Sequence, residues 1–200
     1  MCIRDRAYTV FPSLGDRRSS YFVSEVRDRN GTVLEARTEG EVEPDVIEDG
    51  TAYQMVRLMR DVVQSGTARK AMELGVPLSG KTGTTNDFRD AWFVGYTPEV
   101  VTIAWVGLDN SETMGQGQYG GDVALPIWMD YMEEAIKEYP PSKYQQPEDI
   151  VMTLVDSKTG LLVRKGELGA WAAFKKGTEP TEFTPAPDAV DTASFLTGEF

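Results

Sequence analysis

Two short apolar runs stand close together near the middle of the chain. Residues 91–96 and 100–108 are rich in aromatic and β-branched side chains, and a turn at 97–99 separates them. This pattern predicts a β-hairpin. Apolar residues occupy both alternating sets of positions, so we expect a sheet that is covered on both faces.

Helical spacing appears on either side of this hairpin. Over about 51–65, apolar residues recur three and four positions apart, with Asp49 as the expected N-cap and Gly66 as the expected C-cap. A second stripe runs over 123–138, with Pro126 in its first turn. The stripe residues are Met55, Val56, Leu58, Met59, Val62 and Val63, then Ala124, Ile127, Trp128, Tyr131, Met132, Ala135 and Ile136. We predict an α/β protein of the α+β type, with an antiparallel sheet between helices.

Smaller elements are predicted at both ends of the chain. Residues 21–26 and 32–36 flank an Asp-Arg-Asn-Gly turn, which indicates a tight hairpin. Residues 37–49 form an acidic connector, and residues 150–164 predict a second hairpin. The aromatic residues Trp92, Phe93, Trp105 and Trp128 are expected in the core, because they fall at strand or helix spacing.

The triplet Lys81-Thr82-Gly83 admits two interpretations. Residues 75–82 read G-V-P-L-S-G-K-T, which matches the phosphate-binding P-loop. The triplet also matches the third motif of serine acyl-transferases that react with penicillin. A P-loop needs a strand before Gly75 and a helix that begins at Lys81. The sequence predicts a helix before Gly75 and strand-forming residues after Lys81, so the nucleotide site is disfavoured.

A longer motif carries a family resemblance. Residues 80–98, GKTGTTNDFRDAWFVGYTP, resemble the third motif of class A penicillin-binding proteins, the bifunctional peptidoglycan synthases, and 120–128 resemble the start of that family's closing helix. The resemblance implies that 7–140 is the C-terminal part of a transpeptidase domain with the penicillin-binding-protein/β-lactamase-like fold, incomplete at its N-terminus. Residues 141–176 are then expected to be a linker and hairpin extension, and 177–200 a disordered tail.

The resemblance also implies roles for four residues. Lys81 would place a positive charge beside the nucleophile and the substrate carboxylate, and the Thr84 amide would donate to the oxyanion. Thr82 and Thr84 lie two positions apart, hence on one side of a strand, where their hydroxyls would hold the carboxylate. Gly83 would let the acyl chain lie against the backbone. The ordinary alternative for Lys81 is a solvated lysine at the end of a strand.

The nucleophile that this chemistry needs is missing from these residues. The family's Ser-x-x-Lys and Ser-x-Asn motifs do not occur at any serine from Ser13 to Ser194. The chain has no histidine, which also excludes a Ser-His-Asp triad. Residues 1–6 show neither cap nor apolar pattern, so we expect an unstructured or non-native start to an interrupted sequence, in which Cys2 is not native. We therefore expect these residues to be inactive alone.

A second Lys-Thr-Gly triplet shows that the three letters alone are weak evidence. Lys158-Thr159-Gly160 stands between the apolar runs 150–155 and 161–163. A turn is the ordinary structure at such a place. We interpret this copy as structural.

The net charge disfavours some classes of binding partner. The formal net charge of −12 disfavours nucleic acid and anionic lipid, because both attract basic proteins. The resemblance implies D-Ala-D-Ala stem peptides and β-lactams as partners, no cofactor, and a place on the periplasmic side of the bacterial cytoplasmic membrane, reached through an anchor outside these residues. A β-lactamase-like hydrolase and a non-catalytic envelope interaction module stay open as alternatives.

Overall fold

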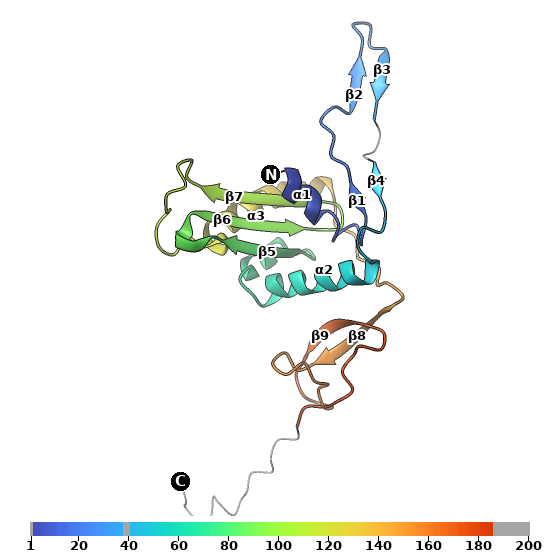
Figure 1. Cartoon of the computed structure of the whole chain (residues 1–200), viewed down its shortest axis with the longest axis vertical. Coiled ribbons are helices and arrows are strands. Elements are labelled where there is room, and N and C mark those ends of the chain that lie inside the picture. Colours follow the sequence, from blue (N-terminus) through green and yellow to red (C-terminus); the bar gives the residue numbers. More distant parts are fainter. Residues whose placement is uncertain (1, 38–40, 186–200) are drawn as a thin grey trace, which may run out of the picture. The chain divides into compact units, whose positions relative to one another are not determined.

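A computed structural model of the chain describes residues 2–37 and 41–185 (Figure 1). The chain divides into two compact units, Met1–Glu148 and Asp149–Phe200. Within the described ranges, no helix combines the length and the apolar character that crossing a membrane requires.

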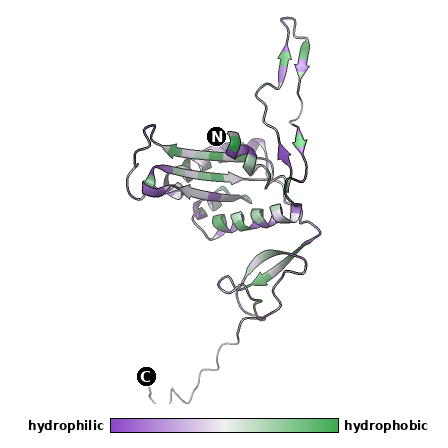
Figure 2. Cartoon of the chain, in the orientation of Figure 1, coloured by the Kyte–Doolittle hydropathy of each residue, from purple (hydrophilic) through white to green (hydrophobic). Residues whose placement is uncertain are grey.

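The first unit is built around an antiparallel three-stranded sheet with the order β5-β6-β7. Strand β5 spans Ser79–Thr84, β6 spans Asp90–Tyr96 and β7 spans Val101–Gly107. The predicted hairpin is therefore confirmed. Residues 82–84 extend the sheet beside β6, as their strand-forming side chains led us to expect. Figure 2 shows apolar residues along β6 and β7.

Helix α3, Leu125–Glu138, covers one face of the sheet (Figure 1). The rings of Phe93 and Trp128 meet edge to face with their centroids 4.9 Å apart. The Trp128 indole N–H donates to the carbonyl of Thr102 at 3.1 Å, so this buried polar group is satisfied. Trp128 and Phe93 are among the largest fully buried side chains, and burying such a side chain contributes about 2 kcal/mol.

Helix α2, Asp49–Gln64, packs along β5 and reaches the opposite face. Its residues Val56 and Met59 form a buried cluster with Tyr96. The buried Ser79 hydroxyl donates to the Val56 carbonyl at 2.9 Å and ties the first residue of β5 to the helix. The sheet thus has helices on both faces, as predicted.

Four residues expected in the interior lie at the surface, and one of them is Leu58 of α2, which is 60% exposed. Trp105 is 40% exposed because it pairs with Trp92 on the face that α3 does not cover, and its indole N–H donates to Asp90 Oδ1 at 2.8 Å. On α3, Ile127 and Tyr131 are more than half exposed. The buried stripe of that helix is turned relative to the prediction and consists of Leu125, Trp128, Met129, Met132 and Ala135.

The ends of α2 also differ from the prediction. Asp49 is the first helical residue and Glu48 the cap, while Ser65 rather than Gly66 follows the last helical residue. Beyond it, the amides of Gly66 and Ala68 both donate to the Val62 carbonyl at 3.1 Å. This shared acceptor turns the chain sharply after the helix.

Short helical turns join the main elements. A 3₁₀ helix, η1, spans Arg69–Leu74, and a second, η2, spans Asn86–Phe88 between β5 and β6. A π-helical turn, η3, spans Gly120–Ala124 and leads into α3. Such π turns are rare and concentrate at functional sites.

The N-terminal residues differ from the expected unstructured start. Cys2–Tyr8 form a short helix, α1, and the Arg4 guanidinium lies 4.1 Å from the ring centroid of Trp92. This cation–π contact joins the segment to the sheet, and Tyr8 packs against the cluster of Val56, Met59 and Tyr96. The acidic connector contains a strand that the sequence did not predict: β4, Val42–Glu43. It pairs antiparallel with β1, Arg17–Arg18.

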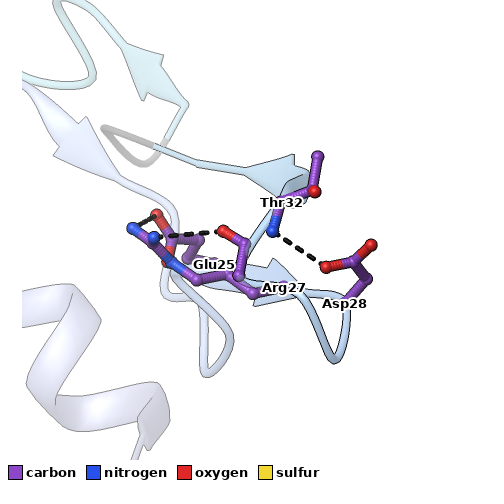
Figure 3. A network of polar contacts seen from close by, with 5 residues as sticks. Glu25, Arg27, Asp28 and Thr32 are labelled. Atoms are coloured by element: carbon purple, nitrogen blue, oxygen red, sulfur yellow. Dashed lines mark hydrogen bonds and ion pairs between the residues drawn. The ribbon is translucent and has the colours of Figure 1, made fainter.

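The predicted tight hairpin at 21–36 is confirmed, with β2 at Glu25–Arg27 and β3 at Val33–Ala36. Figure 3 shows the polar contacts near its turn. The amide of Thr32 donates to Asp28 Oδ1 at 2.8 Å, and Arg27 pairs with Glu25. The hydrogen bonds from the backbone amides of Thr32 and Asn30 hold the pKa of the Asp28 carboxyl below its ordinary value.

The second unit contains a two-stranded sheet of β8, Ile150–Val155, and β9, Ala170–Lys175. The predicted hairpin over 150–164 is wrong, because β8 pairs along its length with β9. Its last residue, Val155, forms a bridge to Leu162. Residues 177–200 were expected to be a disordered tail, but Thr184 within this range donates its amide to the Leu162 carbonyl at 2.8 Å. Residues 186–200 of that expected tail lie outside the described residues.

Candidate functional site on the edge of strand β5

All four predicted site residues lie on strand β5. Lys81, Thr82, Gly83 and Thr84 pair with residues 91–94 of β6 in an unbroken antiparallel register. The strand begins at Ser79, two residues before Lys81, so Lys81 lies inside the strand rather than at its end. An extended chain at Lys81 is incompatible with the helix that a P-loop requires, and the nucleotide interpretation is therefore wrong.

The register decides which backbone groups of β5 are available to a ligand. The Thr85 amide donates to the Asp90 carbonyl at 3.0 Å, which makes this a hydrogen-bonded pair. Because such pairs alternate in an antiparallel ladder, Gly83 and Lys81 also bond to β6. The N–H and C=O groups of Thr82 and Thr84 then point away from β6, toward the free edge of the sheet. The Thr84 amide is thus an available donor.

Lys81 brings a positive charge to the same edge. Its ammonium donates to the Thr82 carbonyl at 2.8 Å, and that carbonyl points outward from the sheet. The side chain is exposed. Since Lys81 pairs with Val94, its side chain starts from the face opposite to α3 and reaches around the strand to the edge.

The hydroxyls of Thr82 and Thr84 occupy the other face. Thr82 lies opposite Phe93, so both threonines share the side that faces α3. The Oγ1 atoms of Thr82 and Thr67 are 2.9 Å apart, and the Gly120 amide donates to Thr84 Oγ1 at 3.1 Å. Thr82 therefore contacts the turn that follows α2, and Thr84 contacts the first residue of η3.

Gly83 lies between these threonines in close contact with β6. A Cβ atom added at this position would lie 3.2 Å from the Cβ of Trp92, which is tighter than most such contacts. A glycine keeps this part of the strand narrow. The site as a whole is open, because Lys81 and Thr84 are exposed and Thr82 and Gly83 are half-buried.

Thr67 and Gly120 were missed by the sequence analysis as partners of this strand. They are 15 and 36 residues from the threonines that they contact, so no local spacing connects them. The only sequence signal is that Gly120 precedes the predicted closing helix. Among residues 2–37 and 41–185, no cluster of three or more His, Cys, Asp or Glu side chains is arranged to hold a metal ion.

Comparison with known proteins decides the family. A family model described as the penicillin binding protein transpeptidase domain matches residues 6–133, more than half of the chain. The chain belongs to this family. It is 43% identical over 149 residues to penicillin-binding protein 1A of Neisseria lactamica, and 40% identical over 174 residues to penicillin-binding protein 1A of Aquifex aeolicus. These alignments cover 72% and 87% of this chain, but only 19% and 24% of the two relatives.

Solved structures agree with this assignment. Penicillin-binding protein 1A from Haemophilus influenzae superposes with a TM-score of 0.79 at 27% identity, over 90% of this chain and 32% of that one. PonA1 of Mycobacterium tuberculosis, solved in complex with penicillin V, superposes with a TM-score of 0.60 at 27% identity, over 72% of this chain and 39% of that one. The predicted penicillin-binding-protein/β-lactamase-like fold is therefore confirmed.

These matches also bear on the alternatives. The curated relatives are penicillin-binding proteins 1A, in agreement with the class A resemblance. Neither the hydrolase nor the interaction module is favoured by these relatives. The chain spans about a fifth to a quarter of the length of these relatives.

Proposed function

We propose that this chain supplies the substrate-binding strand of a peptidoglycan D,D-transpeptidase of the serine type. One observation carries the proposal: β5 combines the Lys81 ammonium and an outward-pointing Thr84 amide at its free edge with the hydroxyls of Thr82 and Thr84 on the adjoining face toward α3. A cation, an amide donor and two hydroxyls within four consecutive residues match the needs of a peptide that ends in a carboxylate and passes through an oxyanion.

The reaction assigns each group a task. A serine elsewhere in the complete protein attacks the penultimate D-Ala carbonyl, the terminal D-Ala leaves, and an amine of a second stem peptide resolves the acyl-enzyme. The Thr84 amide stabilises the oxyanion, an interaction worth about 3 kcal/mol per donor in comparable acyl transfers. Thr82 and Thr84 hold the terminal carboxylate, while Lys81 lowers the energy of negative charge at the edge. Gly83 leaves room for the acyl chain along the strand.

β-Lactams are the corresponding inhibitors, because they too combine a reactive carbonyl with a carboxylate. The PonA1 complex with penicillin V, a structural relative of this chain, supports that ligand class. The relation to penicillin-binding proteins 1A supports a place in the cell envelope, and we propose the periplasmic side of the membrane, where the stem peptides lie.

The complete protein that contains these residues tests the proposal. We expect it to carry a Ser-x-x-Lys motif upstream, to retain a fluorescent penicillin covalently, and to crosslink stem peptides. A complete protein that contains the motif but releases hydrolysed penicillin within seconds would instead be a hydrolase. One that neither labels nor crosslinks would contradict the proposal.

A further inference from the structure

We propose that Thr67 is a positioning residue, which together with the Gly120 amide fixes the hydroxyls of Thr82 and Thr84 as donors toward a ligand carboxylate. The inference rests on the function proposed above and extends it to two groups outside the triplet. It follows from the number of protons that each hydroxyl carries and from the elements that hold Thr67 in place.

The Thr84 hydroxyl is the simpler case. The Gly120 amide is a donor, so Thr84 Oγ1 accepts in the 3.1 Å hydrogen bond between them. A hydroxyl has one proton, and this bond leaves the Thr84 proton unused. Thr84 can therefore donate to an anion at the strand edge without losing its contact with Gly120.

Thr82 depends on Thr67 in the same manner. Either oxygen of the 2.9 Å pair can be the donor when no ligand is bound. Once Thr82 gives its single proton to a carboxylate, only Thr67 can supply the proton between the two oxygens. Thr67 then stabilises the ligand-bound arrangement through Thr82, as the Gly120 amide does through Thr84. Charge-assisted hydrogen bonds make such an arrangement stronger than the neutral pair.

Thr67 is held where this contact requires it. The neighbouring amides of Gly66 and Ala68 both bond to the Val62 carbonyl, so the chain on each side of Thr67 is tied to the end of α2. On the other side, Gly121 approaches so closely that an added Cβ would lie 2.8 Å from the Thr67 carbonyl oxygen. The backbone of Thr67 is thereby held from two sides, which lowers the cost of placing its hydroxyl when a ligand binds.

The test compares acylation of the complete protein by a penicillin and by its methyl ester. Thr67→Val preserves the side chain's shape and removes the hydroxyl. We expect a fivefold to tenfold lower second-order acylation rate constant with the free acid, the effect of one hydrogen bond of about 1 kcal/mol or slightly more. The slower reaction of the ester should be unchanged, because it presents no carboxylate. Thr67→Ser should restore the rate.

Ser65→Ala is the matched control. Its hydroxyl lies two residues away and donates to the Asp61 carbonyl at the end of α2, so its loss should leave both rates unchanged. In a Thr82→Val background, Thr67→Val should have no further effect, because its partner is already absent.

Three outcomes would overturn the inference: an unchanged rate for Thr67→Val with the free acid, an equal loss with the ester, or no recovery in a folded Thr67→Ser protein. Circular dichroism and thermal melting show whether each variant folds. If the unmodified complete protein fails to react with either compound, the proposed transpeptidase function fails, and this inference falls with it.

Discussion

The same three residues, Lys-Thr-Gly, occur in both units of the chain with different structures. Lys81-Thr82-Gly83 is extended on a sheet edge, and its threonine hydroxyl contacts the separate element that holds Thr67. In Lys158-Thr159-Gly160 the chain reverses, with Gly160 at a φ of 73°. There the Asp156 carboxylate accepts hydrogen bonds from the Lys158 amide and from the amide and hydroxyl of Thr159.

This difference shows what makes the first triplet a candidate site. In the turn, the threonine hydroxyl donates to Asp156 and has no proton left for a ligand. On the strand, the residue two positions after Thr82 is Thr84, so a second hydroxyl shares its face, and outward amides remain available. The triplet's chemistry thus depends on whether its backbone is extended and on which neighbours use its polar groups.

The largest effect is expected from the 200-residue chain by itself, which contains both triplets. Neither triplet supplies a nucleophile, and these residues contain no Ser-x-x-Lys, so we expect no covalent adduct with penicillin. Incubation with a fluorescent penicillin followed by a denaturing gel measures this. A labelled band at about 22 kDa that unlabelled β-lactam competes away would show that another serine reacts.

The second prediction compares the lysines of the two triplets in the complete protein. Lys81→Ala should lower the rate constant of acylation by a β-lactam about 100-fold or more, the effect of removing one electrostatic group from such a site. Its melting temperature should change little, because the side chain is exposed. Lys158→Ala is the matched control, since it removes the same residue from the turn and should leave acylation unchanged. Equal rates for the two variants would make Lys81 a bystander.

The third prediction concerns backbone conformation. Gly160 has a positive φ, which other residues adopt at a cost of about 1 kcal/mol, so Gly160→Ala should destabilise the turn by that amount. Hydrogen exchange of the amides in β8 measures the local loss of stability. Acylation of the complete protein should be unaffected. Unchanged exchange rates would mean that the turn does not require this backbone conformation.

The smallest effect is expected from pH. The hydrogen bonds from the Thr159 hydroxyl and amide hold the pKa of Asp156 below its ordinary value of 3.8. A carboxyl with a lowered folded-state pKa stabilises the fold above the unfolded value, and this contribution is lost as the pH falls through the folded pKa. The amide signals of Lys158 and Thr159 should therefore shift below about pH 3.8. Asp156→Asn should abolish the titration, whereas identical titration in that variant would point to another group.

The parts of the fold that were predicted correctly are those with local causes. The β6–β7 hairpin follows from two strand-forming runs around a short turn, and the turn at 28–31 follows from residues that favour tight reversals. The predicted partner of β8 was wrong because its true partner, β9, begins 15 residues after β8 ends, beyond the reach of a hairpin rule. Trp105 was misplaced because spacing gives the face of a strand but not what covers it.

For the candidate site, the sequence predicted the strand character of residues 82–84, the side shared by Thr82 and Thr84, and the family resemblance. Those features depend on side-chain chemistry and on the two-residue period of a strand. The tertiary structure decided that β5 has a free edge, that its alternate amides point outward, and that Thr67 and Gly120 meet its threonines. These contacts join residues far apart in the chain, and only packing of α2 and η3 against the sheet brings them within hydrogen-bonding distance.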